Sequence, residues 1–322
     1  MTYLGIDISK TYFDADFGTA GVKRFDNNAR GISTFLATVD RTSKCVLEAT
    51  GPYSWSLAVA IHTAGMFVAM ANPLQVRRFV QSCFQRTKTD PIDAKMLTLF
   101  GERMQPRAFI PPEAFVIRLR QLLAVQESHI AQRTVLTNQR EALSHMPVID
   151  PTALRILRHA VRAIDKTLCD LAAAMDALIA EHCKGLFEDI RSIPGVGPAT
   201  ARQVIALAGD WGRFETAKAF VAYAGLSPRI YRSGTSVHGS TGIVKLGNPR
   251  FRSALYMCSL SAIRCNKGCR ELYERLRAKG KHKMTALVAV MQKLARQIWA
   301  VATQHTRFDE TKTGARGTRC AA

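Results

Sequence analysis

The sequence predicts an α/β protein continued by a mainly helical (α) C-terminal half, and three observations support this fold class. Short apolar segments typical of strands come first, a regular seam of apolar residues occupies the middle, and short helices with glycine-rich turns follow. The 322 residues suffice for two domains with separate cores. A hydrophobic content of 47% excludes a mainly disordered chain.

The first part of the chain has the periodicity of strands, and helical segments are interspersed among the later ones. Strands are expected at residues 3–8, 12–17, 21–26, 44–48 and 67–71. Helices are expected near 32–39, over 52–65 and after Pro73. Three early strands followed by alternating helices and strands predict a mixed sheet covered by helices.

The middle of the chain predicts two long helices. Residues 113–145 form helix readily but have an irregular apolar pattern, and a proline-containing turn follows them. The second helix has apolar residues spaced 3-4-3-4-3-4-3, namely Leu154, Leu157, Val161, Ile164, Leu168, Leu171, Met175 and Leu178. A coiled-coil arm of two antiparallel helices is the simplest reading, although the seam could also pair with another subunit.

These patterns divide the chain into four parts. We expect an α/β domain at 1–108, a helical coiled-coil arm at 109–185, a mainly helical domain at 186–308 and a flexible tail at 309–322. The long final helix is expected to carry an apolar stripe formed by Met284, Leu287, Met291, Leu294, Ile298 and Val301.

The net charge of +20 is concentrated at one end. Residues 191–322 hold 23 Lys and Arg against 6 Asp and Glu, whereas residues 1–105 carry a net charge of only +3 and residues 106–190 are neutral. Such an excess indicates a polyanionic partner, and nucleic acid is favoured over a generally basic surface or anionic lipid. No apolar run is long enough to span a bilayer, so no membrane partner is expected.

Cysteine usage and the start of the chain bear on localisation. None of the eight cysteines forms a Cys-x-x-Cys pair, and no basic and then apolar leader precedes Tyr3. We therefore expect a cytoplasmic protein with reduced thiols.

Four acidic residues form the main chemical signal. Asp7 lies in the first apolar strand, Glu48 ends a later strand, and Asp90 and Asp93 stand three residues apart at a helix start. Carboxylates held close together favour a divalent cation, which can stabilise both the attacking and the leaving oxygens of a phosphodiester. Individually, Asp90 could be an N-cap, Asp7 a turn residue and Glu48 a solvated strand end, but together they favour a metal site.

Two motifs in the basic part suggest phosphate handling. Gly195 and Gly197 lie in a Pro-Gly-Val-Gly turn between helical segments, which resembles a helix-hairpin-helix whose backbone N–H groups approach a phosphate. A segment rich in Ser, Gly and Arg follows at 224–252. Its chemistry favours hydroxyls that hydrogen-bond phosphate, and it does not single out Ser233 over Ser236 or Ser240 as a nucleophile. Candidate nucleic-acid contacts are Gly195, Gly197, Arg229, Arg232, Lys245, Arg250 and Arg252.

Together, the acidic quartet, the glycine hairpin and the Tyr-Arg-Ser-Gly segment at 231–234 resemble the DEDD transposases of insertion-sequence family one-ten and the related Piv-type DNA invertases. The resemblance covers nearly the whole chain in the same order. It implies a ribonuclease-H-like (RuvC-like) N-terminal domain, in which Asp7, Glu48, Asp90 and Asp93 would bind Mg²⁺. It also implies that Ser233 is the nucleophile, attacking a phosphodiester to give a phosphoserine.

The same resemblance implies partners. Double-stranded donor and target DNA would be chosen by a non-coding bridge RNA. A homodimer would assemble to a tetramer, with the acidic and serine halves of a site coming from different subunits. The setting would be a prokaryotic cytoplasm, with the protein nucleoid-associated when active. We see no Walker motif that would indicate an ATP-dependent step.

Two other functions compete with a transposase or recombinase. A metal-dependent, structure-selective nuclease resembling a Holliday-junction resolvase would cut with water and need no Ser233. A non-catalytic nucleic-acid-binding remnant would keep the basic charge but cut no DNA.

Overall fold

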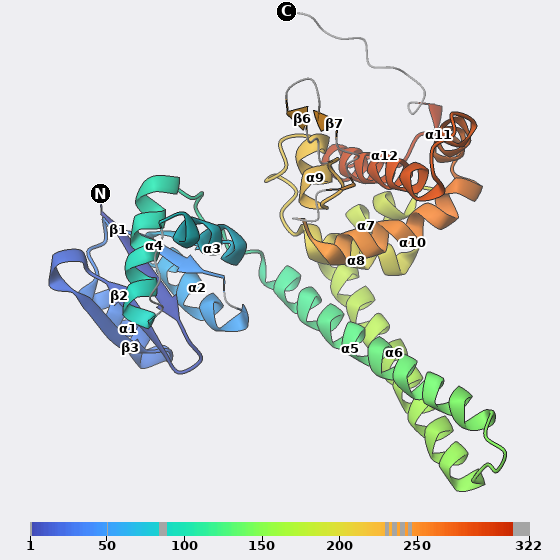
Figure 1. Cartoon of the computed structure of the whole chain (residues 1–322), viewed down its shortest axis with the longest axis horizontal. Helices are drawn as coiled ribbons and strands as arrows, with labels where there is room; N and C mark the ends of the chain where they lie inside the picture. Colours follow the sequence, from blue (N-terminus) through green and yellow to red (C-terminus); the bar gives the residue numbers. More distant parts are fainter. Residues whose placement is uncertain are drawn as a thin grey trace, which may run out of the picture. The chain divides into compact units, whose positions relative to one another are not determined.

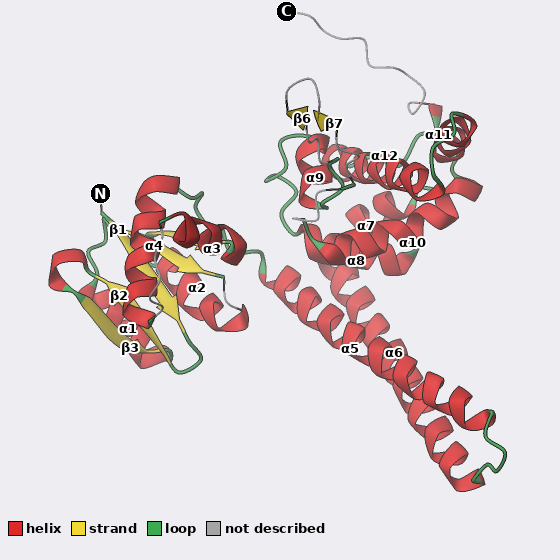
Figure 2. Cartoon of the chain, in the orientation of Figure 1, coloured by secondary structure: helices red, strands yellow, loops and turns green. Residues whose placement is uncertain are grey.

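The computed structural model describes residues 2–49, 51–83, 89–228, 242–243 and 247–311, together with the backbone of 232–233 and 237–238. The chain forms two compact units, Met1–Pro111 and Pro112–Ala322 (Figure 1). The first unit contains the sheet, and the second is almost entirely helical (Figure 2). The division of the second unit into an arm and a basic domain stays a prediction.

The first unit is built on a five-stranded mixed sheet with the strand order β3-β2-β1-β4-β5. Strands β1, β2 and β3 pair as an antiparallel meander, and β1, β4 and β5 pair in parallel. The strands are β1 (Tyr3–Ile8), β2 (Tyr12–Asp16), β3 (Val22–Asp26), β4 (Lys44–Glu48) and β5 (Phe67–Ala71). The predicted mixed sheet is confirmed. Three strands have the expected bounds, β2 ends one residue earlier and β3 begins one residue later.

Alternation along the strands sends side chains to two helical layers. On one face, Ile6, Phe13 and Leu47 pack against α1 (Ala29–Thr38) and α2 (Trp55–Thr63). On the other, Tyr3 and Val46 pack against α3 (Pro73–Ser82) and α4 (Asp90–Met104). The short 3-10 helices η1 (Gly18–Ala20) and η2 (Gly51–Ser54) complete this unit. The sheet is thus covered on both faces, as α/β layer packing requires.

The second unit begins with two long helices, α5 (Ala114–Ser144) and α6 (Pro151–His182), that pack along each other as an antiparallel pair. Asp150 caps α6 by accepting hydrogen bonds from the N–H groups of Thr152 and Ala153. All eight predicted seam residues of α6 are buried or half-buried, and an ion pair between Arg133 and Asp165 links the helices. The knob packing that defines a coiled coil stays a prediction.

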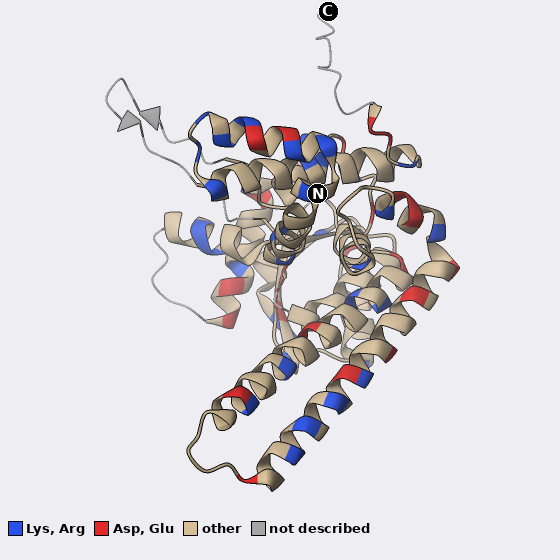
Figure 3. Cartoon of the chain, turned by 90° about the vertical axis from the view of Figure 1, so that its right-hand side faces the viewer, with Lys and Arg blue, Asp and Glu red and all other residues tan. Residues whose placement is uncertain are grey.

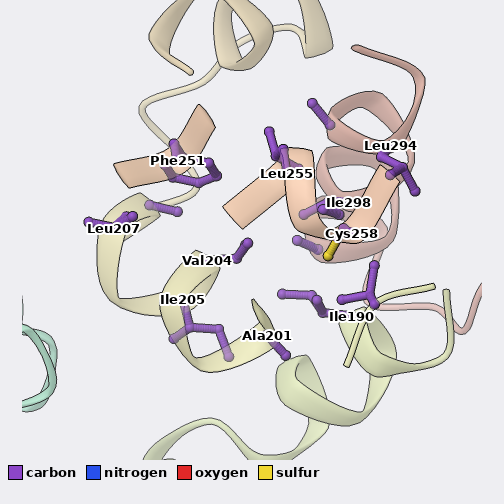
Figure 4. Close-up of a cluster of buried hydrophobic side chains, with 14 of the residues drawn as sticks. Ile190, Ala201, Val204, Ile205, Leu207, Phe251, Leu255, Cys258, Leu294 and Ile298 are labelled. Atoms are coloured by element: carbon purple, nitrogen blue, oxygen red, sulfur yellow. The ribbon is translucent and has the colours of Figure 1, made fainter. Parts of the chain in front are cut away.

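The described remainder of this unit is a helical cluster with a short two-stranded antiparallel sheet. Its elements are α7 (Lys184–Arg191), α8 (Pro198–Ala208), α9 (Ala217–Tyr223), β6 (Arg232–Ser233), β7 (Val237–His238), α10 (Pro249–Cys265), α11 (Lys267–Ala278) and α12 (Lys283–Gln304). The apolar faces of the helices share one core, in which Ile190, Leu255 and Ile298 come from three different helices (Figure 4).

The apolar stripe of the last helix is buried except at its start. Met284, in the first turn of α12, is 49% exposed, whereas Leu287 to Val301 of the stripe are buried. The predicted tail lies outside the described residues from 312 onward. No helix in the described part of the chain combines the length and apolar character needed to cross a membrane.

Candidate active site

Parallel pairing brings two of the predicted acids together. The register of β1 and β4 sets Gly5 opposite Val46 and Ile6 opposite Leu47, so the next step along both strands sets Asp7 beside Glu48. Both side chains lie on the α4 face, because alternation gives Asp7 the same face as Gly5. The carboxyl ends of parallel strands meet at one edge of a sheet, and this edge is therefore acidic.

Helix α4 supplies the other two acids because it crosses β1 at very close range. A Cβ on Gly5 would lie 2.1 Å from the carbonyl oxygen of Ala94 and 2.3 Å from the amide nitrogen of Thr98. Farther along, a Cβ on Gly101 would lie 2.6 Å from the Tyr3 ring. The helix therefore runs antiparallel to β1, with its first turn at the Asp7 end of the strand (Figure 1).

The hydroxyl of Thr98 fixes α4 against β1 through hydrogen bonds. It accepts the N–H of Gly5 at 2.9 Å and donates to Oδ2 of Asp16 at 2.8 Å. Asp16, on β2, is only 5% exposed and also accepts the N–H of Gly18. A buried carboxylate is thus satisfied by hydrogen bonds that tie α4 to two strands.

The four acids lie close enough for the charges of Asp93, Asp90 and Glu48 to act on Asp7. The pKa of Asp7 is raised from 3.8 to about 6, chiefly by burial and then by the negative charges of Asp93, Asp90 and Glu48. The structure therefore brings together all four residues that the sequence analysis selected.

The acids fit a hard divalent cation by donor chemistry and by charge, but not yet by geometry. No three Asp, Glu, His or Cys side chains of the described residues are already arranged to hold a metal ion. Oδ2 of Asp90 accepts a hydrogen bond from the Tyr12 hydroxyl at 2.9 Å and lies 3.4 Å from Nη2 of Arg24. A cation bound by this set would draw the carboxylates closer together.

The residues that support Asp90 were not among the predicted site residues. Asp14, 2% exposed, accepts two hydrogen bonds of 2.8 Å from the guanidinium of Arg24. That guanidinium also lies over the Tyr12 ring, 3.7 Å from its centroid. Asp7, Asp14 and Arg24 face one another across β1, β2 and β3 in the strand register. The alternation Tyr-Phe-Asp-Ala-Asp at 12–16 was the available signal, because it places acids on the same face as Asp7.

Only part of the predicted serine and arginine set can be placed. Ser233 and Arg232 form β6, which pairs with β7 so that Ser233 lies opposite Val237. Arg229 and Lys245 lie outside the described residues. Pro228 and Ile243 form an isolated antiparallel bridge. The roles of these four residues stay predictions.

Three of the four remaining candidates, Gly195, Arg250 and Arg252, have contacts within the second unit. Gly195 has φ +98°, and a Cβ there would lie 2.8 Å from Ala262, so packing against α10 explains this glycine. Gly197 precedes α8 in an exposed position with open space around it. Nε of Arg250 pairs with Glu127 of α5 at 3.0 Å, and Nη1 of Arg252 donates to the Gly247 carbonyl at 2.8 Å. Contact of these residues with nucleic acid stays a prediction, as does the helix-hairpin-helix.

Comparison with known proteins identifies related sequences over most of the chain. Residues 4–146 match the DEDD transposase family of IS110 elements, and residues 188–274 match the family described as "Transposase IS116/IS110/IS902 family". A pilin gene-inverting protein of Moraxella bovis is 31% identical over 320 residues, covering 96% of this chain and 98% of that protein. A transposase for the insertion sequence element IS1328 of Yersinia enterocolitica is 25% identical, with 96% and 99% covered.

The order of the two matched segments follows the structure. The DEDD match covers the sheet domain with its acidic edge and extends through α5, whereas the second match begins in α7 and ends in α11. DEDD transposase domains are in general ribonuclease-H-like, in agreement with the mixed five-stranded sheet. The acidic edge and a relative matched along nearly its whole length lead to one assignment: the chain belongs to the IS110/IS116/IS902 family of transposases and is a DNA transposase or recombinase.

Proposed function

We propose that this protein cleaves and rejoins DNA as an RNA-guided recombinase, with Ser233 as its nucleophile and Mg²⁺ as its metal. The observation that carries the proposal is the convergence of Asp90, Asp93 and Glu48 on Asp7, whose pKa rises to about 6. Like charges held this close are stabilised when they share a divalent cation.

Asp7, Glu48, Asp90 and Asp93 would hold the metal. Bound there, Mg²⁺ supplies charge stabilisation to the oxygens of the scissile phosphodiester. The Tyr12 hydroxyl and the Arg24 guanidinium orient Asp90 through one of its oxygens. Asp14 in turn fixes Arg24 through two hydrogen bonds.

The chemical step is a transesterification at the scissile phosphate. Oγ of Ser233 forms a bond to phosphorus while the bond from phosphorus to the leaving DNA oxygen breaks, and the hydroxyl proton ends on that oxygen. Because one phosphoester replaces another, the reverse attack by a new strand end rejoins DNA without ATP. Arg229, Arg232 and Arg250 lie near Ser233 in the sequence and would neutralise the charge that develops on the phosphate.

Assembly and guidance complete the proposal. A bridge RNA selects donor and target DNA, and a dimer that assembles to a tetramer supplies the acidic and serine halves from different subunits. Family membership and the net charge of +17 over residues 191–322 support nucleic-acid partners. Lys and Arg recur along the helices of the second unit (Figure 3). Exposed apolar side chains on the arm, such as Val135 at 65% and Ile156 at 60%, support contacts between subunits.

A covalent-trapping assay tests this function. Purified protein is mixed with labelled donor and target DNA, Mg²⁺ and RNA transcribed from the flanks of its gene, and is then run on a denaturing gel. We expect a labelled protein–DNA band that is lost in Ser233→Ala and in Asp7→Ala. Ser236→Ala, a nearby hydroxyl, is the matched control and should keep the band. Omitting the RNA tests guidance separately.

A metal-dependent nuclease is the second candidate, because the acidic edge does not depend on Ser233. In that case free cleaved DNA would form without a protein–DNA band, and cleavage would persist in Ser233→Ala but stop in Asp7→Ala. A non-catalytic remnant would bind DNA equally with and without Mg²⁺ and would cut under no condition. Either result would overturn the serine mechanism.

A further inference from the structure

A pocket of about 630 Å³ opens in the second unit, between α11, α12 and the segment that follows α12. One face of α12 forms its floor with Gln292, Lys293, Arg296 and Gln297, at the i, i+3, i+4 spacing of a single helix face. Arg275 of α11 and residues 306–309 form its walls. None of the described residues that line it belongs to the serine segment or to the acidic edge.

Hydrogen bonds hold the wall formed by residues 306–309 in place. The left-handed backbone of His305, with φ 51°, ends α12 and turns the chain back. The N–H of Phe308 then donates to Oγ of Ser192 at 2.7 Å, and the N–H of Lys267 donates to Oε1 of Glu310 at 3.3 Å. The segment that encloses the pocket is therefore tied to two other parts of the unit.

The lining carries a strong excess of positive charge. Arg275, Lys293, Arg296 and Arg307 face one acidic side chain, Asp309, among the described lining residues. Nζ of Lys293 donates to the carbonyl of Gly268 at 2.8 Å. The three arginines are exposed, and none of them has an ion pair within the described residues. Arginines that gather around a pocket and are not paired with carboxylates of the described residues favour a bound anion.

Gln297 provides a second, independent observation. It is only 8% exposed, and its Oε1 accepts a hydrogen bond from Nδ2 of Asn266 at 3.2 Å. Its Nε2 is buried and has no hydrogen-bond partner among the described residues. Burying a donor without a partner costs free energy that an incoming acceptor would restore.

We propose that this pocket binds a phosphate group of a nucleic-acid backbone, with Nε2 of Gln297 donating to a phosphate oxygen and the arginines neutralising its charge. The inference rests on the proposed function, which brings DNA and RNA to this unit. A phosphodiester matches the lining because it is anionic and has only acceptors to offer. Such a contact would position the nucleic acid without reading its sequence.

Two variants test the pocket directly. Gln297→Glu keeps the side-chain length and an acceptor for Asn266, but replaces the unpartnered donor with an anionic oxygen that repels phosphate. Arg275→Gln/Arg296→Gln removes two exposed cations of the pocket. The matched control, Arg264→Gln/Arg277→Gln, removes the same charge from exposed positions of α10 and α11 outside the lining.

Binding is measured in EDTA, so that no cleavage occurs, by fluorescence anisotropy of a labelled 30-base-pair DNA duplex and of an RNA of the same sequence. We expect at least a tenfold loss of affinity at 150 mM salt for both pocket variants and less than threefold for the control. The double variant should also reduce the slope of log K against log salt by about 1 on duplex DNA, since the pocket holds one phosphate and each neutralised phosphate contributes about 0.9. Thermal melts verify folding, and the exposed arginine pair keeps the test valid if Gln297→Glu unfolds.

If the pocket variants lose affinity for the duplex alone, DNA is the source of the phosphate. If they lose affinity for RNA alone, the source is the RNA, and a loss of affinity for both assigns a shared phosphate site. Equal affinities of the pocket variants and the control would overturn the inference. The trapping assay is run on the same proteins. Pocket-dependent binding without any strand cleavage would sink the proposed function and leave this site standing, and cleavage with pocket-independent binding would do the reverse.

Discussion

The hydroxyl of Tyr12 donates a hydrogen bond to Oδ2 of Asp90 at 2.9 Å, across 78 residues of sequence. Arg24 reaches the same oxygen at 3.4 Å while it lies over the Tyr12 ring. Both groups thus donate to Oδ2, and Oδ1 of Asp90 has no hydrogen bond among the described residues. Tyr12 and Arg24 thus hold the carboxylate of Asp90 by one oxygen, and the proposed metal would bind the other.

Replacing Tyr12 by Phe removes only the hydroxyl that orients Asp90. Because partners of a metal-binding carboxylate typically change metal affinity by about 10-fold to 100-fold, we expect Tyr12→Phe to weaken Mn²⁺ binding about tenfold in isothermal titration calorimetry. Tyr53→Phe, at a 44% exposed position, serves as the control and should bind as the parent does. Identical dissociation constants for the two variants would show that the hydrogen bond does not orient a ligand.

Asp7→Asn should stabilise the metal-free protein, and only above acidic pH. The folded state holds the Asp7 proton up to about pH 6, whereas an ordinary carboxyl releases it near 3.8, so the free energy of unfolding falls as pH rises between these values and stays lower above them. The shift corresponds to at most about 3 kcal/mol, and screening at this partly exposed side chain reduces it to about 1 kcal/mol.

Urea unfolding in EDTA at pH 4 and pH 7.5 measures this effect. Asp7→Asn should raise the free energy of unfolding at pH 7.5 and leave it nearly unchanged at pH 4. Asp40→Asn is the control, because hydrogen bonds from Thr42 lower the pKa of that exposed carboxyl and no gain with rising pH is expected. A gain for Asp7→Asn that is equal at the two pH values would contradict the electrostatic explanation.

Gly5→Ala should strongly destabilise the first unit. The added Cβ would lie 2.1 and 2.3 Å from backbone atoms of α4, and backbone atoms cannot move aside as a side chain can. We therefore expect the free energy of unfolding in urea to fall by about 3 kcal/mol. Gly185→Ala in α7 meets nothing within 4 Å and should be neutral or slightly stabilising. A loss below about 1 kcal/mol for Gly5→Ala would mean that α4 does not lie against β1 as described.

Glu127→Gln tests whether Arg250 can contact nucleic acid. The ion pair at 3.0 Å is largely exposed, with 49% of the Arg250 side chain and 30% of the Glu127 side chain accessible, so stability should change by less than about 1 kcal/mol. Freed from its carboxylate, Arg250 should strengthen DNA binding about twofold to threefold in anisotropy at 100 mM salt. Arg250→Gln should weaken it, and an unchanged affinity in both variants would remove Arg250 from the interface.

Local sequence patterns predicted most elements of the fold. Strands β1, β4 and β5 have the predicted bounds because each is a short, largely apolar segment flanked by turn or helix signals. The seam of α6 was visible because its spacing follows the helical repeat over the whole helix. The pattern does not show where burial stops, since Met284 continues the apolar stripe but lies in an exposed first turn.

The sequence alone determined which residues are apolar, which acids interrupt the strands and where the positive charge lies, because composition and periodicity are local properties. Only the tertiary structure decided that Asp7 lies beside Glu48 and that α4 crosses β1 with Asp90 and Asp93 at the acidic edge. It also decided that Asp14 is buried against Arg24 and that Gln297 borders a basic pocket. Periodicity states which face of an element is buried, whereas strand register and helix placement depend on packing between residues far apart in the chain.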